Sequence, residues 1–104
     1  MILHDNTLYV TDSNDVVWSI NAHDGHVNWK QTALKARGLT EPALVNNQLV
    51  LGDKTGYLHV MSTQTGELLA RTQLSSGINI SPSVSGKNVY VLTDNGVLNQ
   101  LSIG

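Results

Sequence analysis

The histidines are the first candidates for chemistry, because two of them stand close together. His23 and His26 flank Asp24-Gly25, a spacing that could suggest a metal site. Zinc sites, however, use three or four nitrogen or sulfur ligands at recognisable spacings, and no third ligand follows here. We therefore interpret this segment as a solvated turn and expect no bound metal. The isolated His59 is expected to be a partly buried, hydrogen-bonded strand residue.

The carboxylates and hydroxyls indicate turns more than catalysis. Asp12, Asp15, Asp53 and Asp94 recur at predicted hairpin turns, whereas a catalytic carboxylate is normally needed once. The chain contains neither a G-x-S-x-G nucleophile motif nor a glycine-rich phosphate loop. The serines between positions 75 and 85 have no evident base partner. The sequence thus predicts no catalytic residue, no cofactor and no enzymatic activity.

These residues are positioned by short strands joined by tight hairpins. In the stretch 46–71, the apolar runs 49–51, 57–61 and 67–70 are separated by turns containing Gly56 and Gly66. Runs of this length, bounded by Gly, Asp and Thr, are typical of strands joined by hairpins. The stretch therefore predicts an antiparallel meander of at least three strands.

The meander recurs on both sides of this stretch. Leu8 and Gly25 lie 41 positions before Leu49 and Gly66, and Gly96 lies 40 positions after Gly56. A period of about 40 residues with four strands per unit is the signature of a propeller blade. We predict an all-β chain, a β-propeller fragment of about two and a half to three four-stranded antiparallel blades.

The predicted blades differ in completeness. We expect 1–34 to form a blade lacking most of its inner strand, 40–73 to form a complete blade beginning at Glu41–Val45, and 79–104 to form a last blade lacking its outer strand. Because propellers close with about four to eight blades, we expect a fragment of a longer protein; a ring of several copies is the alternative. Exposed apolar blade faces and a bare edge strand predict that the 104-residue chain self-associates.

Composition excludes several other classes of protein and site. The chain has no cysteine, a formal net charge of −2 and only 13% charged residues. Disulfides and thiolate sites are thus excluded, and no basic stripe with aromatic residues suggests nucleic-acid binding. No apolar run is long enough for a membrane helix, and the first residues do not resemble a signal peptide.

The segment Thr32–Leu39 is the least strand-like part of the chain. Residues 33–37 could form one helical turn ended by Gly38, but isolated helices this short are marginal. We therefore favour a long loop between two blades, and such loops often carry function. Five aromatic residues are expected in the core: Tyr9, Trp18, Trp29, Tyr57 and Tyr90. Tyr9 and Tyr90 occupy equivalent strand positions, where an aromatic ring would pack between neighbouring blades.

The segment LYVTDSNDVVWSINAHDGHVNWK resembles the repeat of quinoprotein-like (PQQ-type) propellers. The resemblance is carried by an apolar strand, an acidic turn, a second strand, a glycine turn and a strand ending in Trp and a basic residue. Trp29-Lys30 matches this ending, whereas Ala70-Arg71 keeps the basic residue without the Trp. The resemblance implies that an indole docks one blade against the next at the first boundary but not at the second.

The segments LTEPALVNNQLVLGDKTGYLHVMSTQTGELLA, SSGINISPSV and DNGVLNQLSIG more closely resemble the last blades of the BamB family. This resemblance implies an eight-bladed parent that acts as a periplasmic scaffold, anchored to the outer membrane by a lipid absent here. It also implies as partners the POTRA domains of BamA and other components of the outer-membrane β-barrel assembly (BAM) complex. Arg37 aligns with an arginine of the family's connecting loop. The expected partner-binding residues are Arg37, Lys35 and Leu39.

Two other functions share this fold. A PQQ-dependent quinoprotein dehydrogenase would carry a calcium site, an active-site aspartate and often a vicinal cysteine pair, none of which the sequence shows. A ligand-sensing propeller domain is the other alternative, since the fold alone does not determine function.

Overall fold

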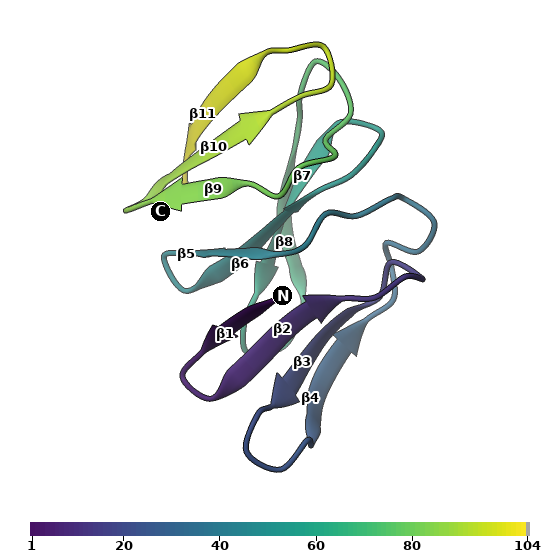
Figure 1. Ribbon diagram of the computed structural model, residues 1–104, viewed down its shortest axis with the longest axis vertical. Helices are drawn as coiled ribbons and strands as arrows, with labels where there is room; N and C mark the ends of the chain where they lie inside the picture. The colour runs from purple at the N-terminus through teal and green to yellow at the C-terminus, as the bar shows by residue number, and fades with distance from the viewer. Residues whose placement is uncertain (104) are drawn as a thin grey trace.

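The computed structural model describes residues 1–103 and consists of three antiparallel sheets that stand side by side (Figure 1). The first sheet has the order β1-β2-β3-β4 and the second β5-β6-β7-β8, while the third contains β11-β10-β9. Each sheet is a meander of neighbouring strands, so the predicted all-β propeller blades are confirmed. The strands are β1 (Ile2–His4), β2 (Thr7–Thr11), β3 (Val17–Asn21), β4 (Val27–Gln31), β5 (Ala43–Val45), β6 (Gln48–Gly52), β7 (Tyr57–Ser62), β8 (Leu68–Gln73), β9 (Ser83–Ser85), β10 (Asn88–Leu92) and β11 (Leu98–Ser102).

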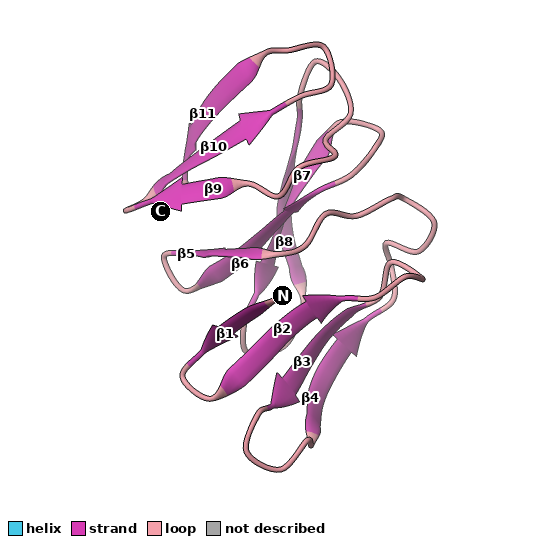
Figure 2. Ribbon diagram, viewed as in Figure 1, coloured by secondary structure: helices cyan, strands magenta, loops and turns pink. Residues whose placement is uncertain are grey.

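Residues 1–103 form strands and loops without a helix, as Figure 2 shows. The segment Thr32–Leu39 is a series of turns in which the Arg37 N–H donates to the Leu34 carbonyl at 3.4 Å. The loop interpretation of this segment is thus confirmed, and the alternative of a helical turn is wrong. Within the described residues, therefore, nothing helical could cross a membrane.

The innermost strands differ from expectation. β5 begins at Ala43 and β9 at Ser83, each directly after a proline that lies outside the strand. Proline has no N–H to give to a ladder, which explains why the pairing starts one residue later. β1 spans three residues, as do β5 and β9, so the expectation that the first sheet lacks most of this strand is corrected.

The hairpin after the second strand of each sheet has the same geometry. The backbone N–H groups of Asp12, Asp53 and Thr93 donate to the carbonyls of residues 16, 57 and 97, each at 3.0 Å. Thr93, and not Asp94, therefore occupies the position of Asp53, which corrects the expected recurrence of aspartate. Three residues further on, Asp15, Gly56 and Gly96 have φ of 61°, 99° and 84°, a left-handed conformation that glycine adopts at little cost.

The core lies between the sheets, and the strands β5, β6 and β7 of the middle sheet are largely buried on both faces, whereas its outer strand β8 is exposed. Leu49 and Leu51 of β6 pack with Tyr9 and Val17 of the first sheet. Val50, between them in the chain, belongs to the cluster shared with the third sheet, because successive strand residues point to opposite faces. The second cluster contains Ala43, Val45, Val50, Leu58, Val60, Ile78, Val89 and Val91.

Trp29 of β4 docks the first sheet against the second. Its indole N–H donates to the Thr63 carbonyl at 2.9 Å, and its ring centroid lies 6.3 Å from that of Tyr9. Docking by an indole at this boundary is therefore observed. At the next boundary, Ile78 packs closely against Gly52 of β6. Of the aromatic residues expected in the core, only Tyr9 is fully buried, while Trp18, Trp29, Tyr57 and Tyr90 are half-buried.

Candidate functional site

The connector between the first two sheets, residues 32–39, is held by backbone hydrogen bonds from both sides. The Asp15 carboxylate accepts the N–H groups of Gly38 at 3.1 Å and Leu39 at 3.0 Å. The Lys54 N–H donates to the Arg37 carbonyl at 3.0 Å. Leu34 is buried, with 3% of its surface exposed. The connector is therefore a fixed part of the molecule that presents selected side chains.

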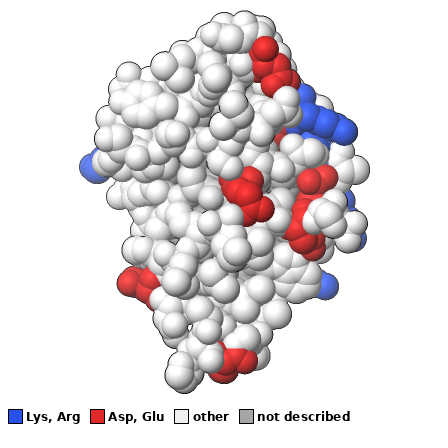
Figure 3. All heavy atoms as spheres, viewed as in Figure 1, with Lys and Arg blue, Asp and Glu red and all other residues white. Residues whose placement is uncertain are grey.

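The three residues expected to bind a partner point into different surroundings. Lys35 is exposed and lines one pocket, whereas Arg37 is half-buried and lines a second pocket. Leu39 is half-buried and packs against the apolar cluster between the first two sheets. The structure thus places Lys35 and Arg37 on two sides of the connector and turns Leu39 inward. Figure 3 shows charged side chains gathered toward the edge that carries the connector in Figure 1.

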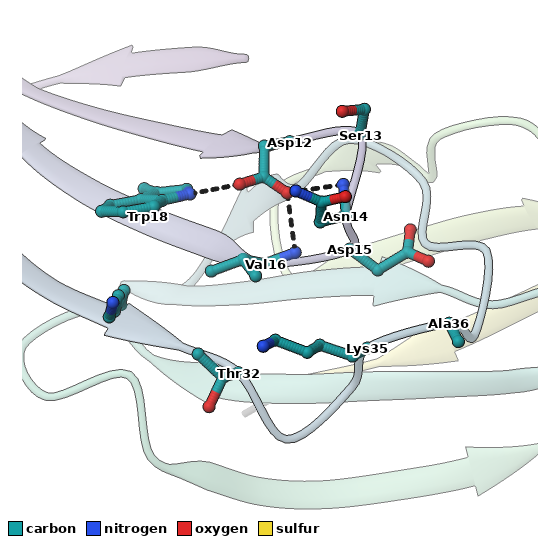
Figure 4. A pocket seen from close by; sticks show the side chains of 10 residues that line it. Asp12, Ser13, Asn14, Asp15, Val16, Trp18, Thr32, Lys35 and Ala36 are labelled. Carbon is teal, nitrogen blue, oxygen red and sulfur yellow. Dashed lines mark hydrogen bonds between the residues drawn. The ribbon is translucent and has the colours of Figure 1, made fainter.

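The first pocket has a volume of about 540 Å³ and is lined mostly by polar and charged residues (Figure 4). The Asp12 carboxylate accepts the indole N–H of Trp18 at 2.7 Å and the backbone N–H groups of Asn14 at 2.8 Å and Val16 at 3.1 Å. The hydrogen bond from Trp18, followed by those from the backbone, holds the pKa of Asp12 below its usual value. The ammonium of Lys30 lies 5.4 Å from the centre of the Trp18 ring.

The second pocket has a volume of about 280 Å³ and lies between the connector and the outer strand β8. Arg37, His59 and Arg71 contribute cationic or polar groups to it, and the connector and β8 contribute the apolar side chains. The apolar lining residues are Ala33, Leu34, Leu68, Leu69 and Ala70.

Behind this pocket lies Asp53, which has no exposed surface. Its Oδ1 accepts the N–H of Thr55 at 3.0 Å, the hydroxyl of Thr55 at 2.7 Å and the N–H of Tyr57 at 3.0 Å. Its Oδ2 lies 2.8 Å from Nε2 of His59 and 3.7 Å from Nη1 of Arg37. Burial works to raise the pKa of Asp53, but the bonds from Thr55, His59 and Tyr57 outweigh it and lower that pKa.

The Asp53–His59 pair repeats the Asp12–Trp18 pair of the preceding blade. In both blades, the turn carboxylate accepts a hydrogen bond from a ring nitrogen six residues further along the chain. An indole N–H cannot act as an acid or base near neutral pH, so this geometry serves to fix the turn. His59 is 2% exposed: the expected hydrogen-bonded role is observed, with more complete burial than expected.

The histidines of the HDGH segment lie at the surface. His23 and His26 are exposed, and their backbone N–H groups donate to the side chains of Asn21 at 2.8 Å and Asp24 at 2.9 Å. Among residues 1–103, no three His, Cys, Asp or Glu side chains come together as metal ligands. The turn interpretation of this segment agrees with its hydrogen bonds.

Sequence reasoning missed the grouping of Arg37 with Asp53, His59 and Arg71. One signal was present, because His59 lies 41 positions after Trp18, in the same place of the repeat. That equivalence could have predicted the bond to the turn aspartate. The approach of Arg37 carried no such signal, since it comes from the irregular connector.

Comparison with known proteins identifies relatives that are longer than this chain. The chain is 71% identical over 103 residues to the outer membrane protein assembly factor BamB of Legionella pneumophila, covering 99% of this chain and 27% of that protein. It is 33% identical over 98 residues to the BamB of Escherichia coli, covering 93% of this chain and 25% of that protein. The chain thus spans about a quarter of the curated relatives that it matches.

Solved structures share the fold at lower sequence identity. The crystal structure of BamB from Moraxella catarrhalis superposes with a TM-score of 0.90 at 22% identity, covering 98% of this chain and 30% of that one. A quinohemoprotein alcohol dehydrogenase from Pseudomonas putida superposes with a TM-score of 0.74 at 21% identity, covering 86% of this chain and 16% of that one. Both likenesses concern the fold alone, and together they confirm propeller blades.

The assignment to a family rests on the sequence. The family described as outer membrane protein assembly factor BamB matches residues 31–104. This match includes the second and third sheets and nearly all of the connector. The chain therefore belongs to the BamB family.

Proposed function

We propose that this chain is part of a non-catalytic scaffold that helps to assemble outer-membrane proteins. The observation that carries the proposal is the match of residues 31–104 to the family of outer membrane protein assembly factor BamB. The relative from Legionella pneumophila, 71% identical, bears the same name. The corresponding location is the periplasm, attached to the outer membrane, as part of an eight-bladed propeller.

The proposed partners are the POTRA domains of BamA and other components of the BAM complex. The connector is the part of this chain best suited to meet them. Its backbone is fixed by Asp15 and Lys54, so binding would not require the loop to become ordered. Lys35 and Arg37 present cationic groups on its two sides. Preorganised loops lose less entropy when they bind a partner.

The hydrogen bonds of the turn carboxylates support the non-catalytic part of the proposal. Asp12 and Asp53 each accept bonds from a ring nitrogen and from backbone N–H groups of their own hairpin. The same arrangement occurs in consecutive blades, as expected for a structural device. The likeness to the quinohemoprotein dehydrogenase, at 21% identity, concerns the fold and does not favour the enzymatic alternative.

A binding experiment with the full-length protein tests this function. The protein is applied to immobilised BamA POTRA domains, and the bound fraction is measured for the wild type and for the variants R37A, K35A and K87A. We expect the wild type and K87A to bind and R37A and K35A to bind more weakly. Failure of the wild type to bind would contradict the proposed partner. Equal binding of all variants would place the contact surface outside the connector.

A further inference from the structure

We propose that the second pocket, between the connector and β8, binds a carboxylate attached to an apolar group of about one amino-acid residue in size. This pocket brings Arg37 and Arg71 together with the side chains of Leu34, Leu68 and Leu69. The proposal goes beyond the scaffold function and does not depend on it, because it concerns a ligand of this chain and not a subunit of an assembly.

The cationic side of the pocket has unused hydrogen-bond donors. Arg37 approaches the Asp53 carboxylate only to 3.7 Å, which is beyond hydrogen-bond distance. Asp53 is already satisfied by three bonds to Oδ1 and by His59 at Oδ2, and a carboxylate offers about four acceptor positions. The guanidinium of Arg37 therefore has no hydrogen-bonded acceptor within residues 1–103.

Arg71 is arranged to receive an anion at its edge. Its guanidinium carbon lies over the Tyr57 ring, 4.8 Å from the ring centre. A cation–π contact of this kind uses none of the N–H groups as hydrogen-bond donors, and the edge of a guanidinium matches a carboxylate in a bidentate geometry. In the described part of the chain, no carboxylate forms an ion pair with Arg71.

Charge balance favours an anionic ligand with a single charge. Asp53 compensates one of the two guanidinium groups, which leaves one positive charge in excess around the pocket. The first pocket differs, because Lys30 and Lys35 there face Asp12 and Asp15. Its two cations and two carboxylates balance, and it offers no comparable preference for an anion.

The apolar side of the pocket selects what the carboxylate is attached to. Leu68 and Leu69 are 37% and 48% exposed, and both belong to the outer strand of the middle sheet. Covering such side chains contributes roughly 25 cal/mol per Å² of apolar surface removed from water. The volume of about 280 Å³ lies near the lower limit for small-molecule sites. The ligand is therefore a C-terminal apolar residue of a peptide or a small apolar carboxylic acid.

Titration of the ¹⁵N-labelled full-length protein by NMR tests this site. The probes are N-acetyl-leucine, its C-terminal amide and N-acetylserine. We expect N-acetyl-leucine to shift the backbone amides of Leu69 and Arg71. The amide and N-acetylserine should bind at least about tenfold more weakly, since one lacks the charge and the other lacks the apolar group.

Variants in which glutamine replaces a cationic residue show which side chains bind the carboxylate. R71Q and R37Q should each weaken the binding of N-acetyl-leucine by about tenfold. The control K87Q, which neutralises an exposed lysine on the hairpin between β9 and β10, should leave this binding unchanged. R71Q changes an exposed side chain, so it still tests the site if R37Q disturbs the connector. Equal binding of the acid and its amide, or equal affinities of R71Q and K87Q, would overturn the proposal.

A longer probe distinguishes the two sources of the ligand. An acetylated tetrapeptide that ends in the same leucine with a free carboxylate is compared with N-acetyl-leucine. Tighter binding of the tetrapeptide supports the site and assigns it to a peptide C-terminus. Equal binding supports the site and assigns it to a small apolar acid. Shifts confined to amides far from β8 and the connector count against the site itself.

Discussion

At the scale of single residues, the same turn position is stabilised in three different ways. Asp12 is bonded to the Trp18 indole and Asp53 to the His59 imidazole. Thr93, in the third sheet, instead donates its hydroxyl to the Val97 carbonyl at 3.1 Å. The position therefore requires a polar side chain that satisfies the hairpin, and the acidity of the group is secondary.

The substitution D53N tests the buried member of this series. An amide replaces one acceptor oxygen with a donor that opposes His59 and Arg37, leaving buried groups unsatisfied. We expect a loss of about 1–3 kcal/mol in the free energy of unfolding at pH 7. Urea unfolding of D53N and the wild type measures it. A loss no larger than that of D12N, at a half-buried position, would contradict the argument.

The pH dependence of stability follows from the same carboxylate. The pKa of Asp53 in the folded chain lies below its ordinary value of 3.8, so the unfolded chain binds the proton first as the pH falls. The stabilising contribution is thus complete at neutral pH and is lost as the pH falls below about 4. In thermal melts between pH 7 and pH 3, the difference between the wild type and D53N should shrink. A difference that stays constant would argue against a lowered pKa.

At the scale of elements, hairpins with equal backbone geometry have different neighbours. Gly25 and Gly66 occupy the same turn in consecutive blades, with φ of 76° and 74°. A Cβ atom at Gly25 would have open space, whereas one at Gly66 would lie 2.5 Å from Cε3 of Trp29. The turn requires the positive φ in both places, but only at Gly66 does the docked indole also require the absence of a side chain.

The matched substitutions G25A and G66A separate these two effects. Both place alanine at a positive φ, which costs about 1 kcal/mol. G66A also displaces Trp29, and overpacking of this kind costs about 1–3 kcal/mol more. Urea unfolding of the two variants should therefore show a clearly larger loss for G66A. Equal losses would mean that the indole moves aside without cost.

Trp29 can be tested directly as the docking residue between the first two sheets. W29A removes the ring from Tyr9 and Gly66 and leaves the Thr63 carbonyl without its donor. We expect a loss of about 3 kcal/mol in the free energy of unfolding, at the lower end of the range for large aromatic truncations because the side chain is half-buried. Denaturant melts measure it, and a loss below about 1 kcal/mol would count against docking.

At the scale of the whole molecule, the end sheets lack the cover that the middle sheet has. Leu3 in the first sheet is 62% exposed. Ile80, just before the third sheet, is 60% exposed, and Leu98 in that sheet is 66% exposed. β11 is an outer strand of its sheet with a free edge in the described chain. Exposed apolar faces and open strand edges favour association with another chain.

The 104-residue chain by itself is therefore expected to self-associate. Light scattering should show an average mass that rises with protein concentration. The variant L98K places a charge on the exposed apolar face of β11 and should shift the mass toward the monomer, whereas L3K tests the opposite end. A monomeric wild type at all concentrations would contradict the expectation.

The sequence by itself determined the repeat, the meander of strands and the turns. These depend on local chemistry: alternating apolar residues specify strands, and Gly, Asn or Asp adopts the positive φ that turns require, as Asn46 and Asn47 do. Such preferences act over a few neighbouring residues, so they can be recognised without knowing the rest of the fold. The first residues of the strands that follow Pro42 and Pro82 were predicted less accurately, because pairing with a neighbouring strand decides where a ladder begins.

Only the tertiary structure decided which distant side chains meet. Arg37 and Lys35 are two positions apart, yet the connector directs them into different pockets. Arg37 meets Asp53, and Trp29 meets Gly66, across the boundary between the first two sheets. Such contacts depend on how one sheet is rotated and packed against the next. That arrangement is fixed by burying the apolar clusters between the sheets and leaves no local pattern in the sequence.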